Sequence, residues 1–277
     1  MHDAKILVPT DFSLCAKNAL NFAIMIAKKL NAKLLLMHAY QVPLSTMDPA
    51  AGAYFSVSVS GIEDNIKSEF DLFKETTPEL QDVDYQILVE QNLTKNAILS
   101  ACESHGCSLV VMGTHGAKGL DEILIGSNTY SVMKESPVPV LAIPHNAGIN
   151  KIKRIVFAGD YKSIEDKNVL QTLIQLSKAF NAEINVLHID EDKDASLSSK
   201  EIGEAKKFEQ YFKNIKHSYH FIHTQNPEEG IEDYAETNDV DLIALIPRKH
   251  GFLDNLSKKS VSKKLAFHSK VPLLALK

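Results

Sequence analysis

Three glycines and the polar residues after them form the stretch of this sequence best suited to chemistry. Two residues separate Gly113 from Gly116, and nine more lead to Gly126, which Ser127 and Asn128 follow directly. Glycine adopts positive φ readily and lets a ligand approach the main chain closely. The free amides and positive dipole at the start of a helix favour phosphate groups. The spacing therefore predicts an anion-binding site.

A strand and a helix are expected to position this stretch. Residues 109–112, Leu-Val-Val-Met, are an apolar run typical of a strand buried on both faces. We expect Ser127, Asn128 or Thr129 to cap a helix that continues towards Met133. The anion would then lie at the carboxyl edge of a parallel sheet, where ligands bind in α/β proteins.

Strands and helices alternate through the rest of the first half. Besides the strand at 109–112, apolar runs predict strands at residues 5–8, 33–40, 85–89 and 137–143. Helices are expected from a Ser13 cap to Asn31, from Ile62 onward, and from a Thr94 cap to Gly106. Residues 41–61 are expected to be a loop with one short extended piece. This alternation predicts an α/β fold with a mainly parallel sheet.

The second half of the sequence repeats the first. Residues 6–11, Ile-Leu-Val-Pro-Thr-Asp, align with residues 155–160, Ile-Val-Phe-Ala-Gly-Asp. The offset between matching residues falls from about 150 early in each half to 133 later, so the first half carries about 17 extra residues, which we assign to the 41–61 loop. Tandem duplication explains this pattern. We expect two domains, at residues 1–147 and 151–277.

The two copies differ at the glycines. At the offset of 133, the three positions carry Ile246, Lys249 and Lys259 in the second half. Their side chains keep a phosphate away from the main chain, so we expect one competent anion site, in the first domain. The alternatives for Lys249 and Lys259 are that they hold a phosphate by charge or fill the vacant pocket, but solvated loop lysines are favoured. The second domain is expected to be structural, with Asp160 as a helix cap.

Several segments together resemble the universal stress protein family. The resemblance covers essentially the whole chain as two tandem domains, and it implies Rossmann-like domains of the adenine nucleotide alpha hydrolase-like type. Each would hold a mainly parallel five-stranded sheet flanked by helices. The Gly-x2-Gly-x9-Gly-Ser pattern resembles that of the family's ATP-binding branch. The segments that carry the likeness are residues 5–11, 110–116, 125–127 and 137–141.

The resemblance implies that the first domain binds ATP. Asp11 would contact the ribose or a Mg²⁺ ion bound with the nucleotide, and Ala39 would meet adenine through its backbone. A protonated His115 could touch phosphate. The full set of expected nucleotide-binding residues is Thr10, Asp11, Ala39, Gly113, His115, Gly116, Gly126, Ser127 and Asn128.

The implied function is a nucleotide-dependent regulator in a stress response rather than an enzyme. No nucleophile elbow or Walker-type Gly-Lys-Ser/Thr is present, and no lysine precedes Ser127 to neutralise a transferring phosphate. A slow ATP hydrolase and a nucleotide-free interaction scaffold remain alternatives. Glu90 favours the scaffold, because it adds a negative charge near the expected pocket rim.

Composition limits the partners. The 277 residues are 44% hydrophobic with a net charge of −5, which gives no general attraction to nucleic acid or anionic membranes. The start resembles no signal peptide and no run reaches transmembrane length, so we expect a cytoplasmic protein. The family resemblance implies pairing through the last strands, Val138–Ile143 and Val271–Leu276, within one chain or in a homodimer. A protein partner is expected but not identified.

Other reactive side chains receive a structural interpretation. Cys102 and Cys107 with His105 could suggest a metal or redox site, but no second pair has zinc spacing, so buried small residues are favoured. The histidines at 217, 220 and 223 cannot all share one face of a strand, which argues against a metal site. His38 and His188 occupy matching strand positions and are expected to be structural.

Overall fold

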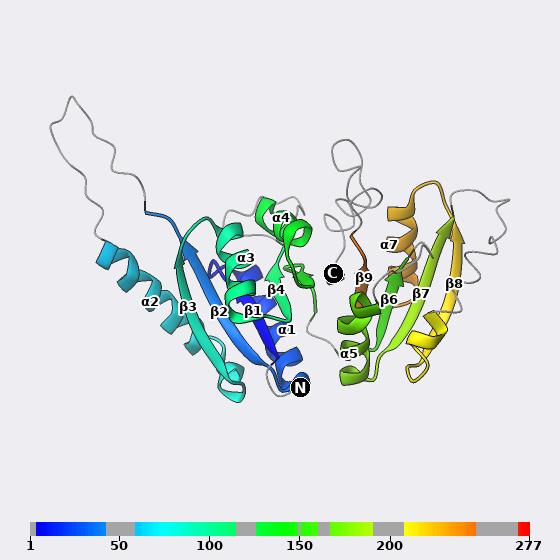
Figure 1. The fold of residues 1–277 in the computed structure, drawn as a ribbon, viewed down its shortest axis with the longest axis horizontal. Helices are drawn as coiled ribbons and strands as arrows, with labels where there is room; N and C mark the ends of the chain where they lie inside the picture. The colour runs from blue at the N-terminus through cyan, green and yellow to red at the C-terminus, as the bar shows by residue number, and fades with distance from the viewer. Residues whose placement is uncertain are drawn as a thin grey trace, which may run out of the picture.

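The computed structural model describes residues 4–42, 59–114, 126–148, 151–159, 167–190, 208–247 and 271–277. Ten strands form one sheet in the order β3-β2-β1-β4-β5-β10-β9-β6-β7-β8 (Figure 1). The strands are β1 (Lys5–Pro9), β2 (Lys33–Tyr40), β3 (Tyr85–Gln91), β4 (Leu109–Gly113), β5 (Val140–Ile143), β6 (Arg154–Ala158), β7 (Glu183–Asp190), β8 (His217–His223), β9 (Leu242–Leu245) and β10 (Leu273–Ala275). The helices are α1 (Leu14–Leu30), α2 (Val59–Glu75), α3 (Thr94–His105), α4 (Ser127–Glu135), α5 (Gln171–Phe180) and α7 (Pro227–Thr237), with short 3₁₀ turns η1 (Pro78–Asp82) and η2 (Lys167–Leu170).

Each half contributes five parallel strands, and the halves join through their last strands. β5 and β10 pair antiparallel, with Leu141 opposite Leu274. The expected pairing of the two halves within one chain is therefore confirmed. The strand order reads the same from both ends of the sheet when each strand is replaced by its counterpart in the other half, as tandem duplication predicts.

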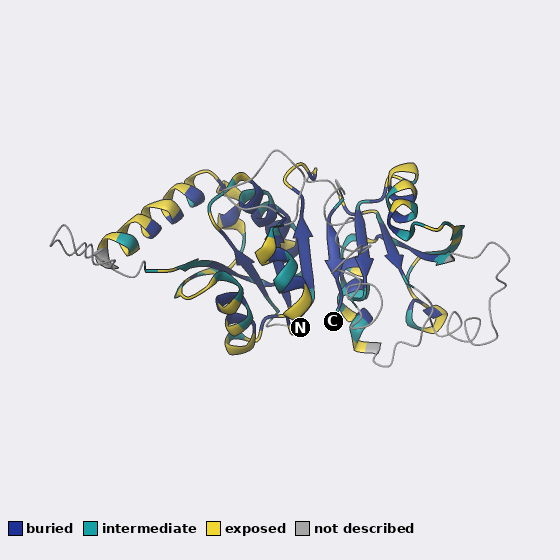
Figure 2. Ribbon diagram, turned by 90° about the horizontal axis from the view of Figure 1, so that it is seen from above, coloured by how far each residue is buried: buried dark blue, intermediate teal, exposed yellow. Residues whose placement is uncertain are grey.

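Helices cover both faces of the sheet, and a hydrophobic core lies on each face. One core joins side chains of α1, α2 and α5 to the sheet, and the other joins those of α3, α4 and α7. Both cores run across the β5–β10 junction into the two halves. Figure 2 shows the buried strands between these two helix layers. No helix in the described ranges is long and apolar enough to cross a membrane.

Local sequence signals set several helix ends. The amide of Ala16 donates to Ser13 Oγ at 3.2 Å, so Ser13 caps α1 as expected. Asn31 ends α1 and Gly106 ends α3, both in the left-handed conformation. The predicted Thr94 cap is wrong, because Leu93 occupies the cap position of α3 and no side chain caps that helix.

Element lengths also differ from expectation. α2 begins at Val59, so the end of the expected 41–61 loop is helical, and residues 43–58 lie outside the described part. β5 begins at Val140 instead of residue 137, since Pro137 and Pro139 cannot donate ladder hydrogen bonds. β3 reaches Gln91. The extra residues of the first half lie between β2 and β3, because β3 matches β8 at an offset of 132.

Candidate functional site

The topological switch point of the first half, where the order in which the chain adds strands reverses, lies between β1 and β4. These strands are parallel neighbours, with Leu7 beside Val110. From β1 the chain proceeds outward to β2 and β3, whereas after β4 it proceeds the other way to β5. The helices after β1 and β4 therefore pack on opposite faces of the sheet, and open α/β sheets bind ligands beyond the carboxyl ends of the strands at such a point. Asp11 follows β1 and Gly113 ends β4, so the two flank this point.

A hydrogen-bonded turn holds Asp11 at the end of β1. The amide and hydroxyl of Ser13 donate to Asp11 Oδ1 at 3.2 and 2.6 Å. The buried hydroxyl of Thr10 accepts from the amide of Phe12 at 2.9 Å, and the Thr10 amide donates to the carbonyl of Met37. Asp11 is exposed, and its carboxylate is anchored to the Ser13 cap that starts α1.

Phe12 fixes this turn in a conformation that the sequence did not reveal. Its φ is 63°, in the left-handed region that is unusual for a bulky residue. The ring stacks on His38 at 4.8 Å and meets Phe70 and Phe73 edge-on. His38 Nδ1 lies 2.8 Å from the carbonyl oxygen of Thr10 and must carry the hydrogen, since a carbonyl only accepts. The expected structural role of His38 is therefore confirmed.

Gly113 is required for packing. A Cβ there would lie 2.8 Å from Cys15 Sγ and 3.1 Å from the carbonyl carbon and oxygen of Cys15. The start of α1 thus lies directly against the end of β4. Gly113 and Gly126 do not use the positive φ that glycine allows: within the described ranges, Gly106 is the glycine with positive φ.

Gly126, and not the polar residues after it, occupies the cap position of α4. Its amide donates to the carbonyl of Thr114 at 2.6 Å, which fixes the helix start against the end of β4. No side chain caps this helix, so the predicted capping role of Ser127, Asn128 or Thr129 is wrong. Thr129 instead donates its hydroxyl to the carbonyl of Gly113 at 2.8 Å. Ser127 and Asn128 are exposed in the first turn, whose amides have no acceptor inside the helix.

The remaining expected residues are placed in part. Ala39 is half-buried near the end of β2, beside Glu90 of β3 in the parallel register. A negative side chain therefore neighbours the expected adenine position. His115 and Gly116 lie outside the described residues. The structure thus brings Thr10, Asp11, Gly113, Gly126, Ser127 and Asn128 to one edge of the sheet, with Ala39 one strand away.

The second half presents a different surface at the matching point, between β6 and β9. Gly159 follows β6 and donates its amide to Leu187, as Thr10 does to Met37. Ile246 follows β9 in place of Gly113, and its partly buried side chain packs against the core shared with α1, α2 and α5. Asp160, Lys249 and Lys259 lie outside the described residues.

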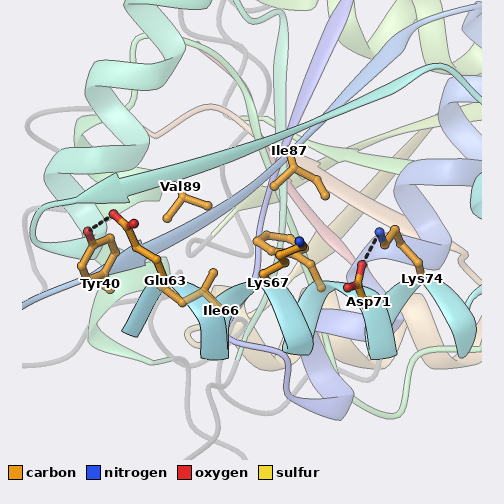
Figure 3. Close-up of a pocket in the computed structure, with 9 residues that line it drawn as sticks. Tyr40, Glu63, Ile66, Lys67, Asp71, Lys74, Ile87 and Val89 are labelled. Carbon is orange, nitrogen blue, oxygen red and sulfur yellow. Dashed lines mark hydrogen bonds and ion pairs between the residues drawn. The ribbon is translucent and has the colours of Figure 1, made fainter. Parts of the chain in front are cut away.

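A separate cavity of about 400 Å³ lies between α2 and the ends of β2 and β3 (Figure 3). Its apolar lining comes from α2 and β3. The Tyr40 hydroxyl donates to Glu63 at 3.5 Å, Lys74 forms an ion pair with Asp71, and Lys67 also lines the cavity. None of the expected nucleotide-binding residues in the described ranges lines this cavity. The apolar lining residues are Ile66, Phe70, Ile87 and Val89.

No cluster of three or more metal-binding side chains occurs within the described part of the chain. On β8, His217 packs against Tyr219, whereas His220 Nε2 contacts Ser218 on the other face. The expected division of these histidines between two faces is confirmed. All three cysteines are buried and free.

Both halves of the chain are similar to known proteins. The model described as the universal stress protein family matches residues 4–144 and again residues 151–277. Universal stress protein MJ0577 of Methanocaldococcus jannaschii is 30% identical over 154 residues, covering 50% of this chain and 93% of that protein. Universal stress protein YxiE of Bacillus subtilis is 28% identical over 145 residues, covering 50% of this chain and 97% of that protein.

A similar fold spans the whole chain in a solved structure. The crystal structure of a universal stress protein from Archaeoglobus fulgidus superposes with a TM-score of 0.72 at 19% identity. The match covers 99% of this chain and 96% of that one. The two-domain arrangement is therefore shared with a protein of low sequence identity.

Proposed function

Because the chain belongs to the universal stress protein family as a tandem two-domain member, we propose that its first domain binds an adenine nucleotide between β1 and β4. The proposal rests on two features that lie together at the topological switch point between β1 and β4. One is the anchored, exposed Asp11; the other is the uncapped start of α4. Ligands of α/β sheets bind at such a point.

The start of α4 suits phosphate. Its first amides have no acceptor inside the helix, and the helix dipole adds partial positive charge. The exposed Ser127 hydroxyl and Asn128 amide can donate further hydrogen bonds. The bond from Gly126 to Thr114 and the bond from Thr129 to Gly113 hold this helix start in place before a ligand arrives. Such preorganisation lowers the entropic cost of binding.

The other end of the nucleotide would lie towards β2. Asp11 is positioned to accept hydrogen bonds from a ribose, and the strand end at Ala39 offers backbone groups for an adenine edge. The residues also fit a magnesium nucleotide, since an exposed carboxylate is a ligand type that Mg²⁺ accepts together with phosphate oxygens. Within the described ranges no protein cluster would hold the ion alone, so the metal would be bound with the phosphates.

The second domain is proposed to be a structural partner. Ile246 places a side chain where the first domain has glycine. Through the β5–β10 pairing the second domain completes the sheet. We propose that nucleotide binding changes the surface near the 113–127 segment, and that partners of this regulator respond to that change.

The test is a charge placed at the start of α4. Ser127→Asp puts a carboxylate where a helix favours one, so the fold is kept, while phosphate is repelled. Losing a charge-assisted hydrogen bond costs about 1.5–3 kcal/mol, which is about a tenfold to hundredfold weaker affinity. Titration calorimetry with ATP in the presence and absence of Mg²⁺ measures this.

A matched control is Thr94→Asp, the same kind of change at the first residue of α3. It should bind ATP as the wild type does. Equal affinity of both variants and the wild type, or no ATP binding by the wild type, would contradict the proposal.

A further inference from the structure

Two of the three cysteines meet where α3 ends. Gly106 ends the helix with a φ of 63°, and Cys107 follows it. The amide of Cys107 donates to the carbonyl of Cys102 at 3.0 Å, and the amide of Gly106 to that of Glu103 at 3.4 Å. This is a Schellman motif, which brings the two side chains that flank the turn into contact. Here both of those side chains are thiols.

The two thiols interact directly. Each thiol shifts the pKa of the other, and the Cys107 thiol donates to the carbonyl oxygen of Ala101 at 3.6 Å. Both side chains belong to the same buried core, with Cys102 2% and Cys107 7% exposed. A disulfide requires close Cα atoms and Cβ atoms that face each other, and the turn already supplies that closeness.

The surroundings shift the pKa values of the two thiols in opposite directions. The hydrogen bond from Cys102 lowers the pKa of Cys107, and the nearby Lys5 ammonium adds to this, whereas burial opposes it. Lys5 Nζ is held at this site by donating to the carbonyl of His105 at 2.9 Å. The pKa of Cys102 is raised by its bond to Cys107 and by burial; Glu103 raises it further and Ser136 opposes. Of the two thiols, Cys107 therefore loses its proton more readily and Cys102 keeps its proton.

We propose that Cys102 and Cys107 form a reversible intramolecular disulfide when the protein meets hydrogen peroxide. The Cys107 thiolate attacks one peroxide oxygen, the O–O bond breaks, and hydroxide leaves to become water on protonation. Cys107 is then a sulfenic acid. The Cys102 sulfur attacks it, the S–S bond forms, the S–O bond breaks, and water leaves with the proton from Cys102. Two thiols are oxidised by two electrons and one peroxide is reduced to two waters.

Cys15 provides an internal control. It is buried like the pair, at 5% exposed, but lies against the carboxyl end of β4, where its thiol donates to the Ile143 carbonyl at 3.5 Å. Cys107 lies just before the other end of β4. Burial alone therefore predicts equal behaviour for the three thiols, whereas the proposal predicts that Cys15 stays reduced.

Intact-mass measurement tests the proposal on the full chain. The folded protein is treated with hydrogen peroxide, unfolded in denaturant with iodoacetamide, and weighed. Untreated protein should carry three alkyl groups, treated protein one, and treated protein then reduced with a phosphine should carry three again. Peptide mapping of the treated wild type should show Cys102 joined to Cys107 and Cys15 alkylated. This measurement needs no variant.

The variants separate the mechanism from general oxidation. Cys15→Ser should still form the disulfide, and Cys102→Ser should instead stop at a Cys107 sulfenic acid that dimedone traps. Three alkyl groups after peroxide, Cys107 oxidised to sulfinic acid without a disulfide, or a disulfide that includes Cys15 would overturn the proposal.

Discussion

Replacing Gly113 with alanine tests why glycine is needed at the end of β4. The new Cβ would lie 3.1 Å from both the carbonyl carbon and oxygen of Cys15, and 2.8 Å from its sulfur. The sulfur can rotate, but the backbone of Cys15 cannot move without disturbing the Ser13 cap of α1. Overpacking of this kind costs about 2 kcal/mol of the free energy of unfolding. A chain of this size should then lose about 4–8 °C of Tm.

Gly126→Ala is the matched control from the same motif. Its Cβ would lie 3.4 Å from the Thr114 carbonyl oxygen, and its φ of −60° suits any residue. We expect a loss of at most about 1 kcal/mol, because alanine is a poorer helix cap than glycine but also restricts the unfolded chain. The chain has no tryptophan, so far-UV circular dichroism should follow thermal and urea unfolding. If Gly113→Ala unfolds at or above the temperature of the control, the packing explanation is refuted.

Three further outcomes follow from individual contacts. Ser13→Ala should lower the free energy of unfolding by about 1 kcal/mol, because it removes the α1 cap, whereas Ser127→Ala, which removes no cap, should leave urea unfolding unchanged. Glu90→Gln should strengthen ATP binding by about twofold to fivefold in calorimetry, since it removes a negative charge, worth about 0.2–1 kcal/mol against an anionic ligand, beside the expected adenine position. Unchanged or weaker binding would place the nucleotide elsewhere. The rate of Cys107 alkylation should increase at a lower pH than that of an ordinary thiol, because the pKa of Cys107 is lowered in the folded protein. Lys5→Met should shift this increase to higher pH. An unshifted pH profile would show that Lys5 does not lower the pKa.

Much of the fold follows from short-range patterns. Apolar runs and helix periodicity placed the strands from β1 to β5 within a few residues, because burial on one or both faces leaves a clear pattern. Ser13, Asn31 and Gly106 act locally, so their roles could be predicted. The internal repeat identified the second half, and the family resemblance predicted the β5–β10 pairing.

Features that depend on distant contacts could not be predicted. The residue that leaves no room for a side chain at Gly113 is Cys15, which lies almost a hundred positions earlier in the chain. Thr129 donates its hydroxyl to the main chain and does not cap its own helix, since the end of β4 lies beneath it. The left-handed φ of Phe12 is stabilised by rings from β2 and α2. Each outcome depends on which element packs against the residue, and spacing alone carries no such information.

We propose that the first domain holds an adenine nucleotide beyond the carboxyl ends of β1 and β4. A crystal structure of the full chain grown with a non-hydrolysable ATP analogue and Mg²⁺ tests it most directly. We predict phosphate oxygens within hydrogen-bond distance of the amides of Ser127 and Asn128, with the ribose beside Asp11. Nucleotide bound beyond β6 and β9 near Ile246, or in the cavity beneath α2, would contradict the claim.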